Sequence, residues 1–244
     1  MKNLPKYIDN APIDTVVRFI ENLSAFGIDI GFDGNSGNEI RKPIASKLDL
    51  SDFHALEERL LKENTAITII TAGSLWATYA SWHLKGDEKT PYLKKSVAYY
   101  EAAEAITTLA QPEGIEARRR LARILIDRLA VRNLDRGISL MEELFSLNKS
   151  YTPTYATYLQ GLNLAKRYRE AVNRANEIIA HSPSGVAPGL HKIKAVSLRA
   201  IIRQSKKDGA LDAALSASCE LLSNEYSTPN DEKVNRNLRA LLRK

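Results

Sequence analysis

The chain has 244 residues, with 35 Lys and Arg against 29 Asp and Glu, a formal net charge of +6 and a single cysteine, Cys219. This length can bury a sizeable core without covalent staples. One cysteine excludes an internal disulfide framework and a zinc site built from cysteine thiolates, so we expect a reducing, cytoplasmic setting. Basic and acidic residues are mixed along the chain, and the net charge alone therefore does not identify a partner.

The N-terminal region predicts one helix followed by an irregular segment. The first residues contain no apolar stretch of signal-peptide length. A helix is expected after Asp14, and four glycines and a proline then interrupt the pattern between residues 27 and 49. Asp29 and Asp33 in this segment match the start of a calcium loop, but Ile40 stands where the bidentate carboxylate belongs. A glycine-rich turn or short hairpin is the better interpretation, and residues 1–50 are expected to pack on the start of a helical domain.

Apolar residues recur at helical spacing almost throughout the rest of the chain, and convincing period-two alternation is missing, which predicts an all-α protein. Ser51 is the expected N-cap of the next helix. Residues 64–84 then run without Lys, Arg, Asp or Glu, but they hold too many Thr, Ser and Ala residues for a membrane span. A helix with small residues on all sides is expected in the middle of a helical stack instead.

The later helices are separated by clear stop and start signals. Thr90 and Pro91 are expected to open a helix that ends before Pro112. Further helices are predicted over residues 113–132, 134–147, 153–167, 168–181, 186–207, 210–224 and 230–243. Since no Pro- or Ser-rich linker divides them, we expect residues 51–244 to form one continuous array.

An internal repeat appears when the sequence is compared with itself at an offset of 34 residues. Apolar or small positions coincide through two consecutive helices. The matched pairs are Leu121 with Tyr155, Ala122 with Ala156, Ile124 with Tyr158, Leu125 with Leu159, Gly137 with Ala171, Ile138 with Val172, Leu144 with Ile178 and Phe145 with Ile179. A 34-residue period of helix, turn and helix has the length of a tetratricopeptide repeat.

The stretch YREAVNRANEIIAHSP, residues 168–183, resembles the second helix of such a repeat, with Tyr168, Glu170 and Ala171 in the expected spacing and Pro183 closing the unit. Residues 99–112 are similar. The resemblance implies a right-handed α-solenoid of antiparallel helix pairs over residues 66–110, 113–147, 153–182 and 186–224, with the last helix as a cap. Gly137 and Ala171 are expected where helices approach closely. Leu159 departs from the family pattern, because a small residue is usual there.

The resemblance also implies a concave groove that binds a peptide or helix of another protein, without catalysis. No nucleotide-binding, metalloprotease or hydrolase motif is present, and the four histidines show no metal-ligand pairing. We therefore expect a non-enzymatic protein with no cofactor and no metal. The aromatic residues, Trp76 and Tyr79 among them, stand at helical spacing and are expected in the core.

Basic residues provide the candidate partner-binding positions. Residues 116–132 place Arg119, Arg123 and, less clearly, Arg120 on one side of a helix whose Leu121, Ile124, Leu125 and Leu129 face inward. They form either a solvated face paired with acids such as Glu116 or an arginine platform for carboxylates or phosphates. Gln160, Asn163 and Arg167 fall near positions that line the groove in the repeat family, and Lys192 and Arg199 can extend the basic surface. The candidates are therefore Arg119, Arg120, Arg123, Gln160, Asn163, Arg167, Lys192 and Arg199.

Two functions are compatible with these features. The first is an adaptor that holds a segment of another protein, fixing acidic or backbone groups with arginine and amide side chains. The second is a nucleic-acid-associated protein whose basic surface contacts phosphates. A membrane partner is not expected, and the oligomeric state is open because Val234, Leu238, Leu241 and Leu242 of the last helix can either cap the array or pair with another copy.

Overall fold

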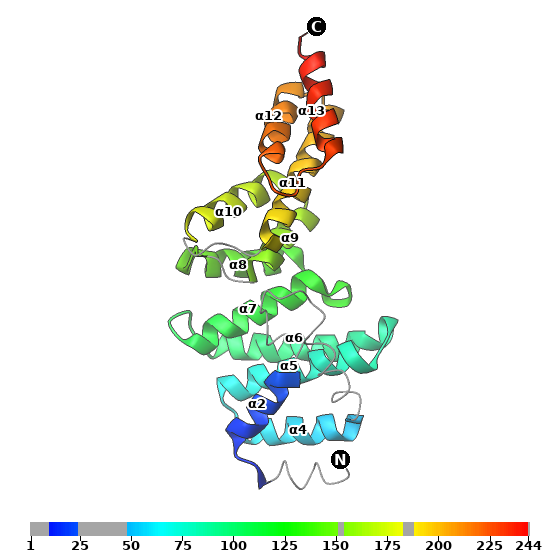
Figure 1. Cartoon of the computed structure of the whole chain (residues 1–244). Coiled ribbons are helices and arrows are strands. Elements are labelled where there is room, and N and C mark those ends of the chain that lie inside the picture. Colours follow the sequence, from blue (N-terminus) through cyan, green and yellow to red (C-terminus); the bar gives the residue numbers. More distant parts are fainter. Residues whose placement is uncertain (1–9, 24–47, 151–153, 183–187, 244) are drawn as a thin grey trace. The chain divides into compact units, whose positions relative to one another are not determined.

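A computed structural model describes residues 10–23, 48–150, 154–182 and 188–243 (Figure 1). These ranges contain eleven α-helices, two short 3₁₀ helices and no strand, which confirms the all-α prediction. The glycine-rich segment, including the residues compared with a calcium loop, lies outside the described residues.

The helices follow one another closely along the chain. Their bounds are α2 Ile13–Leu23, α4 Leu50–Glu63, α5 Ala66–His83, α6 Thr90–Ala105, α7 Pro112–Asp127, α8 Leu134–Leu147, α9 Thr154–Leu164, α10 Tyr168–Ala180, α11 Pro188–Lys207, α12 Leu211–Leu222 and α13 Pro229–Leu241. The 3₁₀ helices are η1 Gly86–Lys89 and η2 Leu129–Val131. None of the described helices is long and apolar enough to cross a membrane.

The start of α4 differs from the prediction. Asp49, not Ser51, is the N-cap, because its carboxylate accepts from the backbone N–H of Ser51 at 2.8 Å and of Asp52 at 3.1 Å. The Asp52 carboxylate in turn accepts from the N–H of Asp49 at 2.9 Å, which completes a capping box. Ser51 lies inside the helix. An Asp two residues earlier satisfies two orphan N–H groups, and a Ser at position 51 is not needed for this purpose.

The chain divides into two compact units, residues 1–144 and 145–244. In the first unit, α5 contacts α2, α4, α6 and α7, and every residue from Thr68 to Ala80 is buried. Figure 1 shows α4, α5, α6 and α7 as successive layers. The small side chains of α5 permit contact on all sides, so the central position predicted for this helix is confirmed.

Two glycines mark where helices of the first unit approach most closely. A Cβ on Gly73 of α5 would lie 2.6 Å from the Cε1 atom of Tyr100 on α6. A Cβ on Gly137 of α8 would lie 2.8 Å from Cγ1 of Ile126 and 3.2 Å from the carbonyl oxygen of Ala122, both on α7. This geometry agrees with the close approach expected at Gly137.

Near the end of α7 the prediction is wrong. The helix was expected to continue to residue 132, with Leu129 facing inward, but α7 ends at Asp127 and Leu129 lies in η2 with 77 % of its surface exposed. The N–H of Asn133 donates to the carbonyl of Leu125 at 3.0 Å, which turns the chain directly into α8. The helical phase is lost at this turn, and periodicity no longer determines which way Leu129 points.

In the second unit each helix packs on the next, and α9 also contacts α11. The core includes Val172 of α10, Leu198 of α11, Leu221 of α12 and Leu238 of α13. The α13 helix lies against α12, with Asn235 Nδ2 3.4 Å from the sulfur of Cys219. Of the apolar residues predicted to share one side of α13, Leu238 is buried and Val234 half-buried, whereas Leu241 and Leu242 are exposed.

Candidate functional site

The arginine cluster predicted on residues 116–132 lies on α7, but its members do not share one exposed face. Arg120 is buried, with 5 % of its surface exposed, because Ala117, Leu121 and Ile124 stand on the same side of the helix. Arg120 therefore does not belong to an exposed platform, which corrects the prediction. The signal was present in the sequence, since position 120 falls three residues after Ala117 and four before Ile124.

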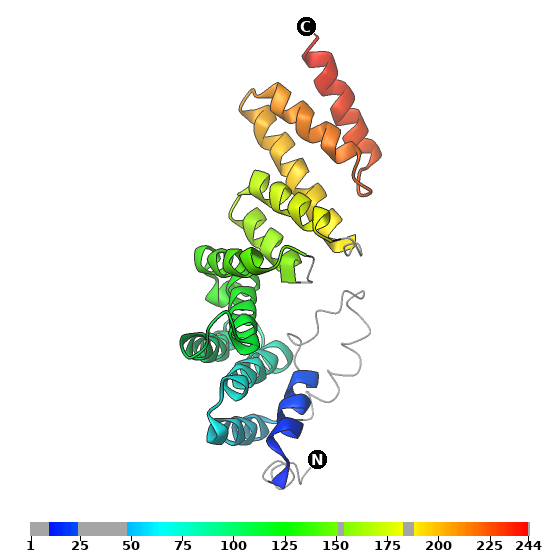
Figure 2. The same cartoon turned by 90° about the vertical axis from the view of Figure 1, so that its left-hand side faces the viewer.

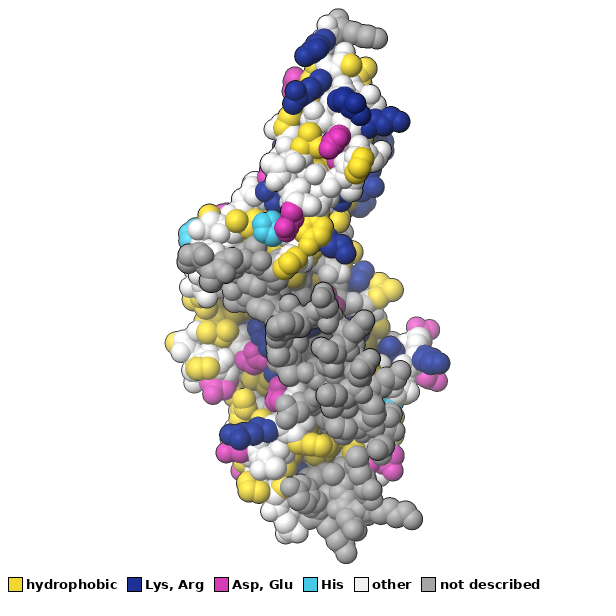
Figure 3. All heavy atoms as spheres, viewed as in Figure 1, with side chains coloured by type: hydrophobic (Ala, Val, Ile, Leu, Met, Phe, Trp, Pro, Cys, Tyr) yellow, Lys and Arg dark blue, Asp and Glu magenta, His cyan; other side chains and the backbone are white. Residues whose placement is uncertain are grey.

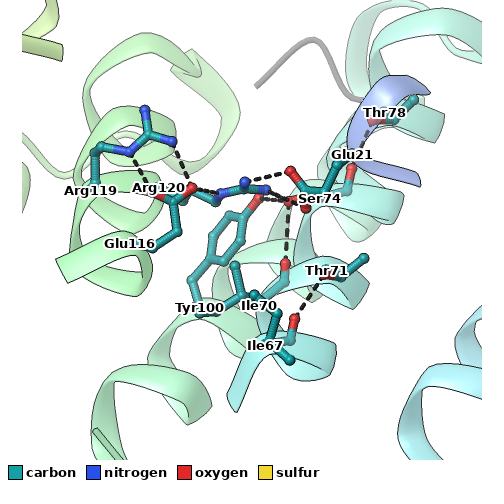
Figure 4. Close-up of polar contacts among 10 residues, drawn as sticks. All are labelled: Glu21, Ile67, Ile70, Thr71, Ser74, Thr78, Tyr100, Glu116, Arg119 and Arg120. Atoms are coloured by element: carbon teal, nitrogen blue, oxygen red, sulfur yellow. Dashed lines mark hydrogen bonds and ion pairs between the residues drawn. The ribbon is translucent and has the colours of Figure 1, made fainter. Parts of the chain in front are cut away.

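Arg120 links three helices of the first unit through its guanidinium (Figure 4). On one side it donates to both carboxylate oxygens of Glu21 on α2, at 2.6 and 3.0 Å. On the other side it donates to Glu116 on its own helix, and a third bond reaches the hydroxyl of Ser74 on α5. The Tyr100 hydroxyl lies 3.1 Å from that of Ser74. Each buried charge is thus hydrogen-bonded and paired.

The electrostatics of this cluster keep both members of the pair charged. Burial alone would raise the pKa of Glu116, but hydrogen bonds and positive charge from Arg119 and Arg120 hold it at about 2. Burial would likewise lower the pKa of Arg120, but the neighbouring Glu116 and Glu21 carboxylates raise it above its ordinary value. The cluster is a buried ionic link between elements.

The other arginines of α7 are paired with nearby acids. Arg119 donates to both oxygens of Glu116 at 2.6 Å, and Arg123 lies 3.6 Å from the carboxylate of Asp127. These pairs have the i, i+3 and i, i+4 spacing of a solvated helix face, which was one of the two interpretations of the sequence. Binding of a partner by Arg119 or Arg123 stays a prediction.

In the second unit, α9 and α11 lie side by side and run in the same direction. Ser197 of α11 donates to the side-chain oxygen of Asn163 on α9 at 2.8 Å. Three residues further along the chain, Lys166 lines the same cleft as Ile201 and Ser205 of α11. Along both segments the cleft lies closer to the C-terminus than the Asn163–Ser197 hydrogen bond does, which indicates that α9 and α11 run in the same direction.

This pairing places a set of exposed residues on one surface, the α9–α11 face. Helical spacing puts Gln160 and Leu164 to one side of Asn163, and it puts Lys192, Val196 and Arg203 to the matching side of Ser197. The members of the face are Gln160, Leu164, Lys192, Val196 and Arg203, all exposed. Its two aliphatic side chains, Leu164 and Val196, have 40 % and 46 % of their surfaces exposed.

The predicted binding residues of the second unit thus separate into two groups. Gln160 and Lys192 lie on the α9–α11 face, and Lys192 forms no ion pair with any described residue. By contrast, Asn163 is bonded to Ser197, and Arg167 donates to both oxygens of Glu170 at 2.8 Å. Arg199 is tied to Asp231 of α13 at 2.8 Å and to the carbonyl of Tyr226 at 2.6 Å. Hydrogen bonds from Arg199 and Thr228 lower the pKa of Asp231, so this contact joins α11 to α13.

Two open clefts flank these helices. One, of about 480 Å³, lies where α9 and α11 end and α10 and α12 begin, with Arg167, Arg169 and Gln204 in its lining. The other, of about 410 Å³, holds Lys194 and Glu220, whose charged atoms are 2.8 Å apart. The polar groups of both clefts bond one another: Gln204 donates to Asp208 at 2.9 Å, and Asn176 donates to Glu220 at 3.3 Å.

Charge is distributed unequally between the two units. Residues 145–244 carry sixteen Lys and Arg and eight Asp and Glu, a net charge of +8, whereas residues 1–144 carry 19 and 21, a net charge of −2. On the side shown in Figure 3, dark-blue Lys and Arg side chains gather over the part occupied by α12 and α13. The surplus positive charge of the chain therefore belongs to the unit that carries the α9–α11 face.

One further polar cluster lies in the first unit, around Glu57 of α4. Its carboxylate accepts from the Trp76 indole at 2.6 Å, from the Tyr99 hydroxyl at 2.5 Å and from Lys95, whose nitrogen lies 2.6 Å away. Burial would raise the pKa of Glu57, but these donors hold it below its usual value, while burial and Glu57 together raise the pKa of Tyr99. Every oxygen of the carboxylate is occupied by side chains of the protein, which is the arrangement of a structural link.

Within the described part of the chain, His, Cys, Asp and Glu residues form no group of three that suits a metal ion. Sequence reasoning did not identify Glu21 or Ser74 as partners of Arg120, since they are 99 and 46 residues away. Leu164 and Val196 were also missed. Their positions look like core positions of an amphipathic helix, and their exposure becomes evident from the pairing of α9 with α11.

Comparisons with known proteins identify no relative of this chain. No protein-family model matches it. No curated protein is significantly similar to it in sequence. No solved structure matches it in fold. Its function is therefore inferred from its own residues.

Proposed function

We propose that the protein is a non-enzymatic binding scaffold that holds an acidic segment of another protein on the α9–α11 face. The observation that carries the proposal is the composition of that face: two exposed aliphatic side chains beside exposed cations and an amide, on a unit with a net charge of +8. Exposed aliphatic residues gathered beside polar groups are typical of protein-binding surfaces.

The arrangement of helices supports a repeat scaffold. At the 34-residue offset, Leu121 and Ile124 of α7 and their counterparts Tyr155 and Tyr158 of α9 are all buried. In the following helix, Ile138 of α8 and Val172 of α10 are buried as well. We propose that these helices are degenerate repeats similar to tetratricopeptide repeats, arranged as a right-handed α-solenoid of antiparallel pairs. In such an array the first helices of successive pairs, here α9 and α11, line the inner surface.

The chemistry of the face defines the ligand class. Lys192 and Arg203 attract carboxylates, and the amide of Gln160 can bond both the N–H and C=O groups of a peptide backbone. Leu164 and Val196 lose water when aliphatic side chains cover them. A peptide that combines Asp or Glu with Leu, Ile or Val satisfies all of these groups.

The test is a selection from a displayed library of random peptides, followed by binding measurements on purified variants. We expect enrichment of acidic, aliphatic peptides whose affinity falls at least tenfold in Val196→Asp and several-fold in Lys192→Glu. Arg169→Glu is the matched control, because it makes the same charge change at an exposed position of α10, and it should leave binding nearly unchanged. Equal losses in Lys192→Glu and Arg169→Glu, or no enrichment, would contradict the proposal.

A second candidate, binding to the phosphates of a nucleic acid, is favoured by the net charge of +8 alone. In that case affinity for random single-stranded RNA should fall steeply with salt concentration, since counterions are released on binding. Lys192→Glu and Arg169→Glu should then weaken binding equally, and Val196→Asp should have no more effect than the added charge explains. A phosphate backbone has no apolar groups that could cover the exposed aliphatic side chains of the face. We therefore rank this function second.

A further inference from the structure

The α2 helix is amphipathic and packs against α4 and α5 in the first unit. Val16 and Ile20, four residues apart, are buried, and Ile13 and Val17 are half-buried on the same stripe. They pack in one cluster with Phe53 and Leu56 of α4 and Trp76 of α5. Figure 2 shows α2, in dark blue, beside the cyan helices of the same unit. The outer side of α2, with Asp14, Thr15 and Arg18, is exposed. This is the pattern by which a helix is recognised in a groove, through apolar residues at helical spacing.

The polar end of α2 makes a charged contact with a different helix. Glu21 directly follows Ile20. Its carboxylate accepts hydrogen bonds from both Nη atoms of Arg120 on α7, at 3.0 and 2.6 Å (Figure 4). A bidentate contact of this kind requires one position and one orientation of the carboxylate. The buried apolar residue Ile20 and the charged residue Glu21 are therefore neighbours in the sequence of α2.

Arg120 also has two partners outside α2. Arg120 keeps Glu116 of its own helix as a partner, and the Ser74 hydroxyl of α5 holds its other side. Without α2, the guanidinium would retain Glu116 as an ionic partner and would lack the carboxylate of Glu21. A guanidinium presents two parallel donors that match the two oxygens of a carboxylate, so a carboxylate from another helix can take the place of Glu21.

We propose that the surface beneath α2, formed by Phe53, Leu56, Ser74, Trp76 and Arg120 and named here the α2 groove, is a binding site for a helix of a partner protein. The partner helix carries two aliphatic residues four positions apart and a carboxylate directly after the second, and it replaces α2. The α2 helix is the resident competitor. This inference concerns the first unit and does not depend on the function proposed for the α9–α11 face.

Covalent attachment gives α2 an advantage over any free helix. A tethered segment competes at an effective concentration on the order of millimolar. The wild-type chain should therefore bind a free helix weakly, and weakening α2 should expose the site. The decisive comparison is between full-length chains that differ only in how strongly α2 binds to the rest of the first unit.

The probe is a fluorescein-labelled peptide with the sequence of residues 10–23, titrated by fluorescence anisotropy into full-length chains. Ile20→Asp puts a charge into the apolar contact, and we expect it to bind the peptide about 100-fold more tightly than the wild type. Arg18→Asp is the matched control, because it places the same residue on the exposed side of α2 and should bind like the wild type. A second peptide that keeps Val16, Ile20 and Glu21 but replaces Asp14, Thr15 and Arg18 should bind equally well, whereas its Glu21→Lys form should bind at least tenfold more weakly.

Circular dichroism melts establish that each chain is folded. If Ile20→Asp does not unfold cooperatively, Glu21→Ala replaces it, and about a tenfold gain in peptide affinity over the wild type is expected. Failure of a folded Ile20→Asp chain, or of Glu21→Ala in its place, to bind more peptide than the wild type would show that α2 is a fixed part of the core and overturn the proposal. Light scattering that finds folded wild-type dimers dissociating in Glu21→Ala would also overturn it, since the occupant would be α2 of a second copy.

Discussion

Gly73 shows how a single atom controls a helix contact in this protein. A Cβ added to Gly73 would lie only 2.6 Å from the Cε1 atom of the Tyr100 ring. Tyr100 is completely buried, so neighbouring atoms hold the ring in place. We expect Gly73→Ala to lower the free energy of unfolding by about 2 kcal/mol, because overpacking in a tight core forces the backbone apart. Chemical denaturation measures this change.

The control for this substitution is Gly189→Ala in the first turn of α11. No atom lies within 4 Å of a Cβ built there, so alanine should be neutral or stabilise by up to about 1 kcal/mol. Equal destabilisation by the two substitutions would contradict the packing argument, because no close contact surrounds a Cβ at Gly189 and helix propensity favours alanine there.

Glu116 predicts how stability depends on pH. Its pKa in the folded protein is about 2, below the ordinary value of 4.5. Its contribution to the free energy of unfolding is therefore complete above pH 4.5 and is lost as the pH falls from 4.5 toward 2. Glu116→Gln should lower the free energy of unfolding by about 2 kcal/mol at pH 7, a figure that allows for solvent screening.

Urea unfolding of both proteins from pH 7 to pH 2 measures this effect. The difference between wild type and Glu116→Gln should shrink below pH 4.5, whereas Glu113→Gln, the same change in the first turn of α7, should differ little from wild type throughout. A constant difference between wild type and Glu116→Gln across this range would mean that the loss does not arise from the charge of Glu116.

At the scale of an element, the end of α9 is held in an unusual conformation. Lys166 has a φ of +61°, in the left-handed region, and the N–H of Arg167 donates back to the carbonyl of Leu162 at 2.8 Å. This is the position at which helices favour glycine. We expect Lys166→Gly to stabilise the protein by about 0.5 to 1 kcal/mol, as relief of strain exceeds the added entropy of the unfolded chain.

Thermal unfolding of Lys166→Gly should therefore show a higher midpoint than the wild type. The matched substitution Lys207→Gly, in the last helical turn of α11, should lower the midpoint, because glycine weakens a helix at ordinary φ values. A lower midpoint in both variants would indicate that Lys166 makes contacts whose loss outweighs the strain.

The elements also show what the sequence could predict. Helical periodicity identified the class, and the charge-free stretch identified α5 as the central helix, because both depend on local composition and spacing. The end of α7 was missed because the 3₁₀ turn at Leu129 depends on a backbone bond between Asn133 and Leu125. The first turn of α4 was misassigned because two neighbouring residues, Asp49 and Ser51, are both good caps.

The candidate site was predicted less completely than the fold. Exposed basic and amide residues such as Lys192 and Gln160 can be selected from the sequence by type and helix face. The burial of Arg120 follows from the apolar residues three before and four after it on α7, but its partners Glu21 and Ser74 lie far away in the chain, and no local pattern identifies them. Val196 has the residue type of a core position, and its exposure follows from the direction in which α9 and α11 pair.

At the scale of the whole molecule, the unequal charge of the two units predicts different responses to salt. Repulsion among like charges destabilises the unit of +8, and added salt screens it. Between 20 and 300 mM NaCl we expect slower hydrogen exchange at the buried amides of α11 and α12. The amides of α5 and α6, in the unit of −2, provide the internal control and should change little. Faster exchange in α11 and α12 would mean that ion pairs such as Arg199–Asp231 contribute more than repulsion costs.

The same imbalance has a consequence for how the molecule meets others in solution. Opposite signs of net charge prevail in the two compact units of the chain, +8 in residues 145–244 and −2 in residues 1–144. An acidic macromolecule attracts residues 145–244 more strongly than residues 1–144 once it comes within about a Debye length, roughly 8 Å at physiological ionic strength. We expect encounters with such a molecule to take place mainly through residues 145–244.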